Sequence, residues 1–255
     1  MATPLLKTSY GDRVSQTGYQ SISRDNVTTK NGVVNATLIL LTICVISGIG
    51  VVWTGMNISP SIASTLGMVG AVGVLVSTLV LLFSPSLRQN SKAVGIIMAI
   101  LQGMMLGGFT FFVGTFQYRG ADGWNLVGQA LMGTTALFLI ALLLYRTGAV
   151  RVSSTFTKVV VFGAAGFGAL YAINLGITLV TGSNPLMSQG PIPIIVGVVA
   201  ILLGTMSLIQ DFDTIDKMVE AGTEKSYTWM LATALLSSLV WLYMEILRVR
   251  HLLSQ

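Results

Sequence analysis

The fold is decided by the stretch Gln210–Arg250, which reads QDFDTIDKMVEAGTEKSYTWMLATALLSSLVWLYMEILRVR. Almost all of the remaining chain consists of long apolar runs. Six of the nine acidic residues fall inside this stretch: Asp211, Asp213, Asp216, Glu220, Glu224 and Glu245. An unpaired carboxylate is costly in hydrocarbon, so acids beside and within membrane helices need partners or a function.

Composition indicates an integral membrane protein. Of the 255 residues, 53% are hydrophobic and only 9% are charged, whereas a soluble domain has roughly 25% charged residues. The net charge of +5 comes from bases in short segments beside the apolar runs. Such bases orient a protein in the bilayer, so we expect lipid rather than nucleic acid as the partner. The single cysteine, Cys44, excludes an intramolecular disulfide.

Seven apolar runs, each near the ~20 residues that a bilayer requires, predict an all-α protein with seven transmembrane helices. The six prolines fall in the tail, in loops or at the first turn of a run, as uninterrupted helices require. The predicted spans are Val33–Trp53, Ile62–Phe83, Ala93–Gly114, Asn125–Tyr145, Lys158–Val180, Ile192–Gln210 and Tyr227–Leu247.

The distribution of Lys and Arg predicts the orientation. Eleven of the 14 bases lie in the tail and in the second, fourth and sixth connections, and only Arg119, Arg248 and Arg250 lie on the other side. We therefore expect a cytoplasmic N-terminus and an external C-terminus. Residues 1–32 are predicted to be a mobile cytoplasmic tail, and residues 33–255 the seven-helix domain.

The acids after the sixth span are expected on one face of a helix. If Gln210–Ala221 continues that span and ends at Gly222, four residues fall within an arc of about 100°, and Asp211 points to the opposite side. The four are Asp213, Asp216, Lys217 and Glu220. Asp213 and Lys217 have the favourable i, i+4 spacing of an ion pair. This face is either a solvated helix end or, with Asp213 nearest the hydrocarbon, part of an ion or proton path.

The seventh span carries a second polar face. Ser238, Trp241, Glu245 and Arg248 are spaced 3, 4 and 3 residues apart and share one side of a helix. Glu245 lies inside the apolar run, one turn before Arg248. An i, i+3 ion pair lowers the cost of both charges, so we expect this face to point into the bundle. A purely structural ion pair near the external interface would give the same spacing.

Glycines are spread through the spans, with Gly103 and Gly107 as a Gly-x-x-x-Gly pair. Such residues allow close approach of helix backbones. We expect packing within one bundle, with a dimer face as the alternative, and the sequence leaves the oligomeric state open.

Several enzyme and cofactor classes lack their residues. The last span has no lysine for retinal, and the only histidine, His251, follows that span, which argues against haem and against a serine–histidine protease. Only Asp213 is a candidate for an aspartyl protease, which needs two membrane aspartates. No phosphate-binding loop or Cys/His cluster is present in the sequence. We therefore expect no enzyme activity and no cofactor.

These residues resemble the Bax inhibitor-1 family, the transmembrane BAX-inhibitor-motif proteins, and most closely its bacterial branch. The resemblance is carried by Asp211-Phe-Asp-Thr-Ile-Asp216, by Gly222, Lys225 and Trp229, and by Leu239-Val-Trp-Leu-Tyr-Met-Glu-Ile-Leu-Arg248. It implies six helices around a central C-terminal seventh and a bacterial plasma membrane. It also implies a pH-sensitive calcium leak gated by two aspartates, on the sixth and seventh helices. The first matches Asp213, and the position of the second is occupied by Ser238.

The leading hypothesis is a pH-sensitive cation leak channel, with Ca²⁺ as the permeant ion. Asp213 would bind the cation or titrate as a latch against the seventh helix, and Asp216, Glu220 or Asp211 would complete the pathway. One alternative is a non-conducting regulator that binds other membrane proteins, such as a protease or a cell-death or stress component. The other is a proton-coupled transporter, although no repeat between halves is visible.

Overall fold

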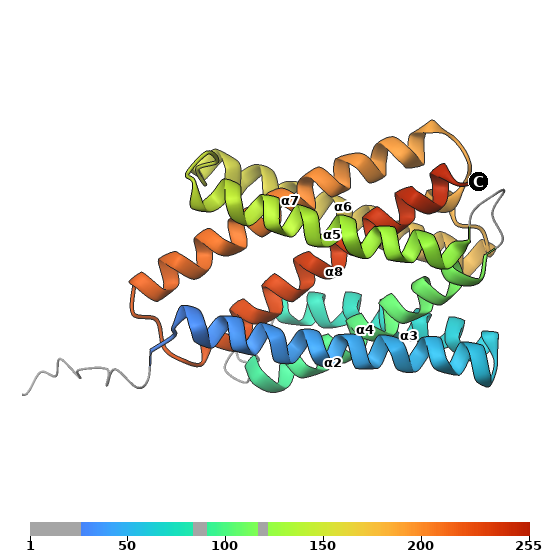
Figure 1. Ribbon diagram of the computed structural model, residues 1–255, viewed down its shortest axis with the longest axis horizontal. Coiled ribbons are helices and arrows are strands. Elements are labelled where there is room, and N and C mark those ends of the chain that lie inside the picture. Colours follow the sequence, from blue (N-terminus) through green and yellow to red (C-terminus); the bar gives the residue numbers. More distant parts are fainter. Residues whose placement is uncertain (1–26, 84–90, 117–121) are drawn as a thin grey trace, which may run out of the picture.

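The computed structural model describes residues 27–83, 91–116 and 122–255, and these form seven α-helices long and apolar enough to cross a membrane (Figure 1). The seven predicted spans are thus confirmed. Most of the helices extend beyond the predicted limits. Their bounds are α2 Lys30–Asn57, α3 Pro60–Phe83, α4 Ser91–Thr115, α5 Gly123–Arg146, α6 Ser154–Thr181, α7 Pro191–Glu220 and α8 Tyr227–Leu253. A short 3-10 helix, Pro185–Met187, lies between α6 and α7.

The end of α7 follows the prediction. The helix continues through the acid-rich segment to Glu220, and Gly222 then adopts a positive φ of 65°. The amides of Gly222 and Thr223 bond to the carbonyl oxygens of Val219 and Met218, at 3.1 Å each. This is the pattern of a Schellman motif, in which glycine is favoured at the left-handed position. The turn reverses the chain and brings α8 back alongside α7.

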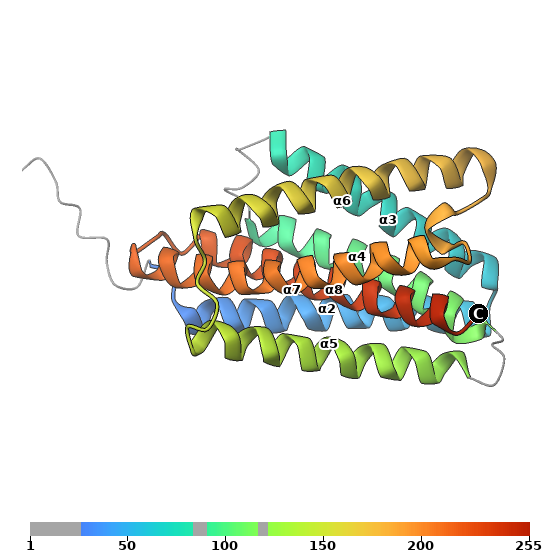
Figure 2. The same ribbon diagram turned by 90° about the horizontal axis from the view of Figure 1, so that it is seen from above.

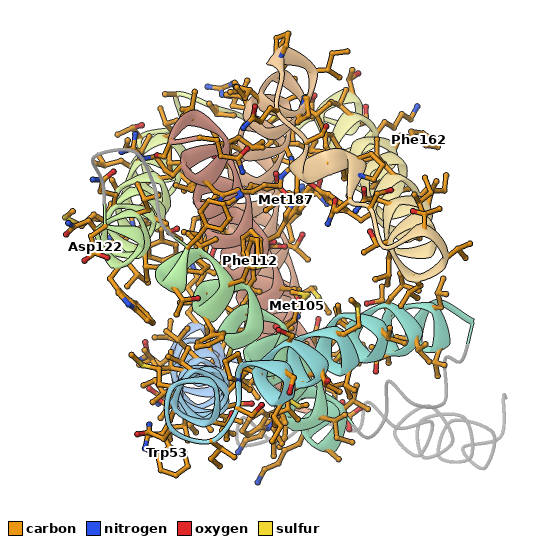
Figure 3. All side chains as sticks on the ribbon, turned by 90° about the vertical axis from the view of Figure 1, so that its right-hand side faces the viewer. Trp53, Met105, Phe112, Asp122, Phe162 and Met187 are labelled. Carbon is orange, nitrogen blue, oxygen red and sulfur yellow. The ribbon has the colours of Figure 1, made fainter. Side chains whose placement is uncertain are left out.

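Helix α8 buries more of its residues than any other span. It packs directly against α2, α4, α5 and α7. Helix α3 packs mainly on α4, and α6 mainly on α7; both lie on the outside of the bundle (Figures 2 and 3). Four helices therefore contact α8 closely, and the expected ring of six around it is not confirmed. A buried position suits α8 because its polar residues would be costly on the lipid face.

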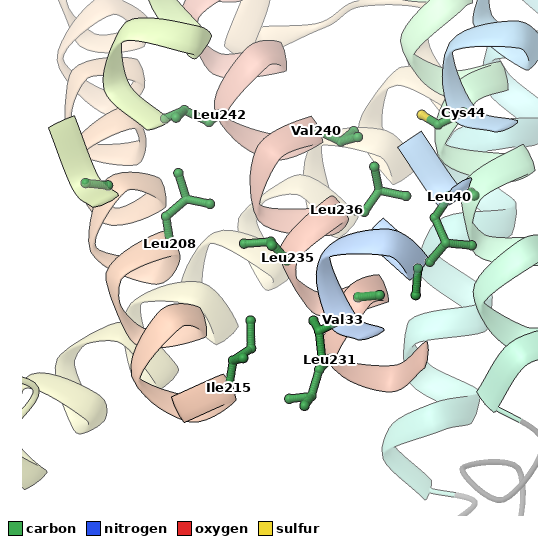
Figure 4. Packing of buried hydrophobic residues seen from close by; sticks show 14 of the residues in the cluster. Val33, Leu40, Cys44, Leu208, Ile215, Leu231, Leu235, Leu236, Val240 and Leu242 are labelled. Atoms are coloured by element: carbon green, nitrogen blue, oxygen red, sulfur yellow. The ribbon is translucent and has the colours of Figure 1, made fainter. Parts of the chain in front are cut away.

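The largest apolar core lies where α8 meets α2 and α7 (Figure 4). Leu236 and Leu242 of α8 are fully buried, as are Leu40 of α2 and Leu208 of α7. These side chains fix the rotation of α8 about its axis. They thereby determine which neighbours its polar residues meet.

Glycines let α4 approach α2 and α3 closely. A Cβ atom added to Gly103 would collide with the carbonyl oxygen of Cys44, and one added to Gly107 with that of Gly48. Gly67 of α3 lies against the backbone of Gly108 in the same way. The Gly-x-x-x-Gly pair therefore packs within the bundle, as expected, which is the use of small residues in membrane helices.

Replacing Gly103 with alanine is expected to destabilise the protein by about 1–3 kcal/mol, because the methyl group would push α4 away from the α2 backbone. Gly50→Ala is the matched control: Gly50 also lies in a helix, and among the described residues no atom beyond its chain neighbours and its own helix backbone lies within 4 Å of an added Cβ. Unfolding in detergent, followed by circular dichroism, measures both. Equal stability of the two variants would contradict the close contact.

The residues just before α2 contact the connection between α7 and α8. Thr28 is buried; its amide donates to the carbonyl of Thr223 at 2.7 Å, and its hydroxyl to that of Glu224 at 2.8 Å. Thr29 caps α2 by accepting a bond from the amide of Gly32. The predicted tail boundary at residue 32 is therefore too late, because α2 begins at Lys30. The predicted mobility of residues 1–26 lies outside the described residues.

The far end of α8 also differs from the prediction. The helix continues past Leu247 to Leu253, and His251 is buried in it rather than lying in a tail. Its ring contacts the rings of Phe112 and Phe116 of α4. The extension adds a further turn with which α8 packs against α4.

Candidate functional site

Asp211 makes the polar contact between α7 and α8. The hydroxyl of Ser238 donates to Asp211 Oδ2 at 2.6 Å, and Ser207 Oγ lies 3.2 Å from the same hydroxyl. Ser238 itself is buried. The carboxylate thus accepts a hydrogen bond from a hydroxyl of α8, which in turn contacts Ser207 of α7, and the described residues supply no ion pair for it. Protonation or movement of Asp211 would therefore act directly on the α7–α8 contact.

Asp213 lies on the other side of α7. Its Oδ2 is 2.6 Å from the ammonium of Lys217, and 18% of its side chain is exposed. The predicted i, i+4 pair is thus formed. Asp213 lines a cavity of about 1380 Å³ between α2, α5, α7 and α8. This carboxylate is accessible from the cavity.

Asp216 joins three helices at the same end of the bundle. Its Oδ1 is 2.7 Å from Lys30 of α2, and its Oδ2 accepts a 2.8 Å hydrogen bond from the hydroxyl of Tyr145 of α5. Its side chain is 29% exposed. Glu220, one turn further on, is exposed. Asp216 thus ties the start of α2 and the end of α5 to α7.

The hydrogen bond to the last span, which was expected of Asp213, is made by Asp211. Asp211, which was predicted to point away from the other acids, bonds to Ser238, while Asp213 pairs within its own helix. The rotation of α7 explains the difference, because the face opposite the acid cluster is the one turned toward α8. Ser238, where the resemblance places the second aspartate, lies directly at this contact.

Glu245 and Arg248 form a buried ion pair near the opposite end of α8. Arg248 Nη2 is 2.6 Å and Nε 3.1 Å from Glu245 Oε2, and the two side chains are only 4% and 7% exposed. Tyr171 of α6 donates its hydroxyl to Glu245 Oε1, and its ring lies under the guanidinium. Arg248 Nη1 is buried without a hydrogen-bond partner among the described residues. The pair therefore connects α6 to α8.

Polar groups follow one face of α8 between these two sites. Ser238, Trp241, Glu245 and Arg248 span ten residues, which corresponds to about 15 Å along a helix. That is about half the thickness of the hydrocarbon layer. This face carries polar side chains from the Asp211 contact to the Glu245 pair.

The described residues contain no group of three or more His, Cys, Asp or Glu side chains that could hold a metal ion. Binding of Ca²⁺ at Asp213 stays a prediction. A permeant cation needs only transient contacts, and Asp213 and Asp216 are the two carboxylates that line the cavity.

Several partners at the site have no signal in the sequence. Lys30 and Tyr145 meet Asp216, and Tyr171 meets Glu245, across separations of about 70 residues or more. Lysines and tyrosines at helix ends are common. An alignment that paired these positions by covariation is the signal that would have identified them.

Fold and site together define a multi-pass membrane protein whose last two helices hold partly buried carboxylates. A model of the family described as Bax inhibitor 1 like matches residues 4–255, and the chain belongs to that family. No curated protein and no solved structure matched the chain.

Proposed function

We propose that the protein is a pH-sensitive cation leak of the Bax inhibitor-1 type, with Ca²⁺ as the permeant ion. The observation that carries the proposal is the bond between Asp211 of α7 and Ser238 of α8. It holds a carboxylate between two helices, at the inner end of the polar face of α8. Asp213 supports the same function because it places negative charge in the neighbouring cavity.

The roles follow from these positions. Asp213 and Asp216 would give a passing cation transient carboxylate contacts in the cavity, in exchange for their ion pairs with Lys217 and Lys30. Asp211 would act as the latch between α7 and α8. The Glu245–Arg248 pair would close the far end of the polar face. Opening would require α7 to move relative to α8.

Acid is expected to open the pathway. Charged and titratable groups at the inner end include Lys30, Tyr145, Arg146, Arg151, Lys158, Asp211, Asp213, Asp216, Lys217, Glu220, Glu224 and Lys225. Protonating Asp211 weakens its charge-assisted bond to Ser238. This change loosens the closed arrangement of α7 and α8, so cation flux should rise as the pH falls toward mildly acidic values.

For orientation, we propose that the end containing Lys30, Arg146 and Lys217 faces the cytoplasm of a bacterial cell and that the C-terminus is external. The excess of bases at this end supports the assignment. The family resemblance supports the bacterial plasma membrane.

The proposal is tested with Asp211→Asn and Asp213→Asn in liposomes. The amide keeps the size of each side chain and removes its charge. Asp211→Asn is expected to abolish the pH response of Ca²⁺ flux, because the latch no longer titrates. Asp213→Asn is expected to lower the flux and keep the pH response.

Glu224→Gln is the matched control, since Glu224 is an exposed acid at the same end of the bundle, in the connection after α7. If the pH response persists in Asp211→Asn and disappears in Asp213→Asn, then Asp213 rather than Asp211 is the titrating latch. If neither the wild type nor any variant gives flux above that of protein-free liposomes, the alternative of a non-conducting regulator is favoured.

A further inference from the structure

The cavity also forms a groove that opens between α2 and α5. Both helices pack on α8, and Leu235, Leu239 and Val240 of α8 line the groove between them. Figure 1 looks onto this face, with α5 above α2 and α8 crossing between them. Large apolar side chains along the walls are exposed in the isolated chain, namely Val34, Leu38, Val45 and Leu131. In a membrane these side chains need an apolar partner.

The length of the groove matches one leaflet. On α2 its lining runs from Lys30 to Val45, and on α5 from Arg146 to Leu131. Fifteen residue steps of helix span about 22 Å, and one leaflet with its headgroup region is about 20–22 Å thick. A lipid acyl chain would therefore lie along the groove over the full depth of its leaflet.

The mouth of the groove is positively charged. Lys30, Lys217, Arg146 and Arg151 line it together with Asp213 and Asp216. Each acid is already paired with one of the lysines. Neither arginine forms an ion pair within the described part of the chain, and both are exposed. Two guanidinium groups with free donors suit a phosphate group, which arginine binds in a bidentate manner.

We propose that this groove binds an anionic phospholipid, with one acyl chain between α2 and α5 and the phosphate at Arg146 and Arg151. The charge of the mouth and the apolar depth below it together fit an amphiphile with an anionic headgroup. A transmembrane helix of another protein would fill the apolar part and leave the two arginines unpaired. The inference does not depend on the proposed leak, because lipid binding is measured without flux.

Native mass spectrometry of the purified full chain in detergent tests the proposal. Phosphatidylglycerol and phosphatidylcholine with identical acyl chains are added in turn, and the lipid-bound fraction is compared. The wild type is expected to retain phosphatidylglycerol preferentially. Arg146→Gln with Arg151→Gln should weaken phosphatidylglycerol binding by about fivefold or more, from the usual contribution of basic residues near anionic lipid.

Two matched controls distinguish lipid binding in the groove from non-specific binding of lipid elsewhere on the protein. Lys158→Gln with Lys225→Gln removes the same charge at the same end of the bundle from exposed residues outside the groove, and should leave the preference intact. Leu38→Trp fills the groove and should reduce retention of both lipids. Ile39→Trp adds a side chain of the same size at an exposed position of α2 outside the groove, and it should leave the retention of both lipids unchanged.

Equal retention of the two lipids by the wild type would overturn the proposal. So would an arginine pair variant that behaves like its lysine control, or a Leu38→Trp variant that behaves like Ile39→Trp. Circular dichroism spectra establish that each variant keeps its helical fold. A loss of cation flux in the Asp211 and Asp213 experiments would leave this result unaffected.

Discussion

Replacing Arg248 with methionine is expected to destabilise the protein by about 3–5 kcal/mol, because Glu245 would remain as an uncompensated buried charge. Glu245 is 3% exposed and Arg248 6% exposed, so solvent cannot take over the role of the guanidinium. Methionine keeps the length and apolar stem of the side chain. The free energy of unfolding in mixed detergent micelles measures the loss.

A double-mutant cycle distinguishes a lost pair from lost packing. Glu245→Gln combined with Arg248→Met removes both charges and should recover a large part of the stability. Lys158→Met is the surface control, because Lys158 is exposed in α6. A double variant as unstable as the sum of the single variants would show that the two charges do not interact.

Ser238→Asp is expected to produce the largest change in pH dependence. Ser238 Oγ lies 2.6 Å from Asp211 Oδ2, so the new carboxylate would face the existing one. Two carboxylates at this distance hold together when they share one proton, and ionisation of the second is disfavoured by repulsion. Loss of the shared proton as the pH rises would therefore push α7 and α8 apart, whereas acid would keep them together. The sign of the pH response should therefore reverse, with more Ca²⁺ flux at neutral than at mildly acidic pH.

Ser238→Asn is the control for this change, since it has the size of aspartate without the charge. Flux into liposomes at the two pH values is compared for both variants and the wild type. An unaltered pH response in Ser238→Asp would mean that the Asp211–Ser238 contact does not control the pathway.

The sequence was sufficient to predict the membrane spans. Long apolar runs, prolines confined to their edges and glycine at position 222 each have a local physical cause, and all of them reappear in the structure. The helix ends were less predictable. Lys30 and His251 extend α2 and α8 beyond the apolar runs because contacts at the ends of the bundle hold them.

Within one helix the site residues were also predictable. The i, i+4 spacing of Asp213 and Lys217 and the i, i+3 spacing of Glu245 and Arg248 correspond to ion pairs in the structure. Contacts between helices could not be predicted, because they depend on how each helix is rotated in the bundle. Asp211 illustrates this, since nothing local indicates that its side of α7 faces Ser238.

The most direct test of the account is Ca²⁺ entry into liposomes that contain only the purified wild-type protein. We expect entry above that of protein-free liposomes, increasing when the medium is changed from neutral to mildly acidic pH. Entry equal to that of protein-free liposomes at both pH values would contradict the assignment of a cation pathway along α7 and α8.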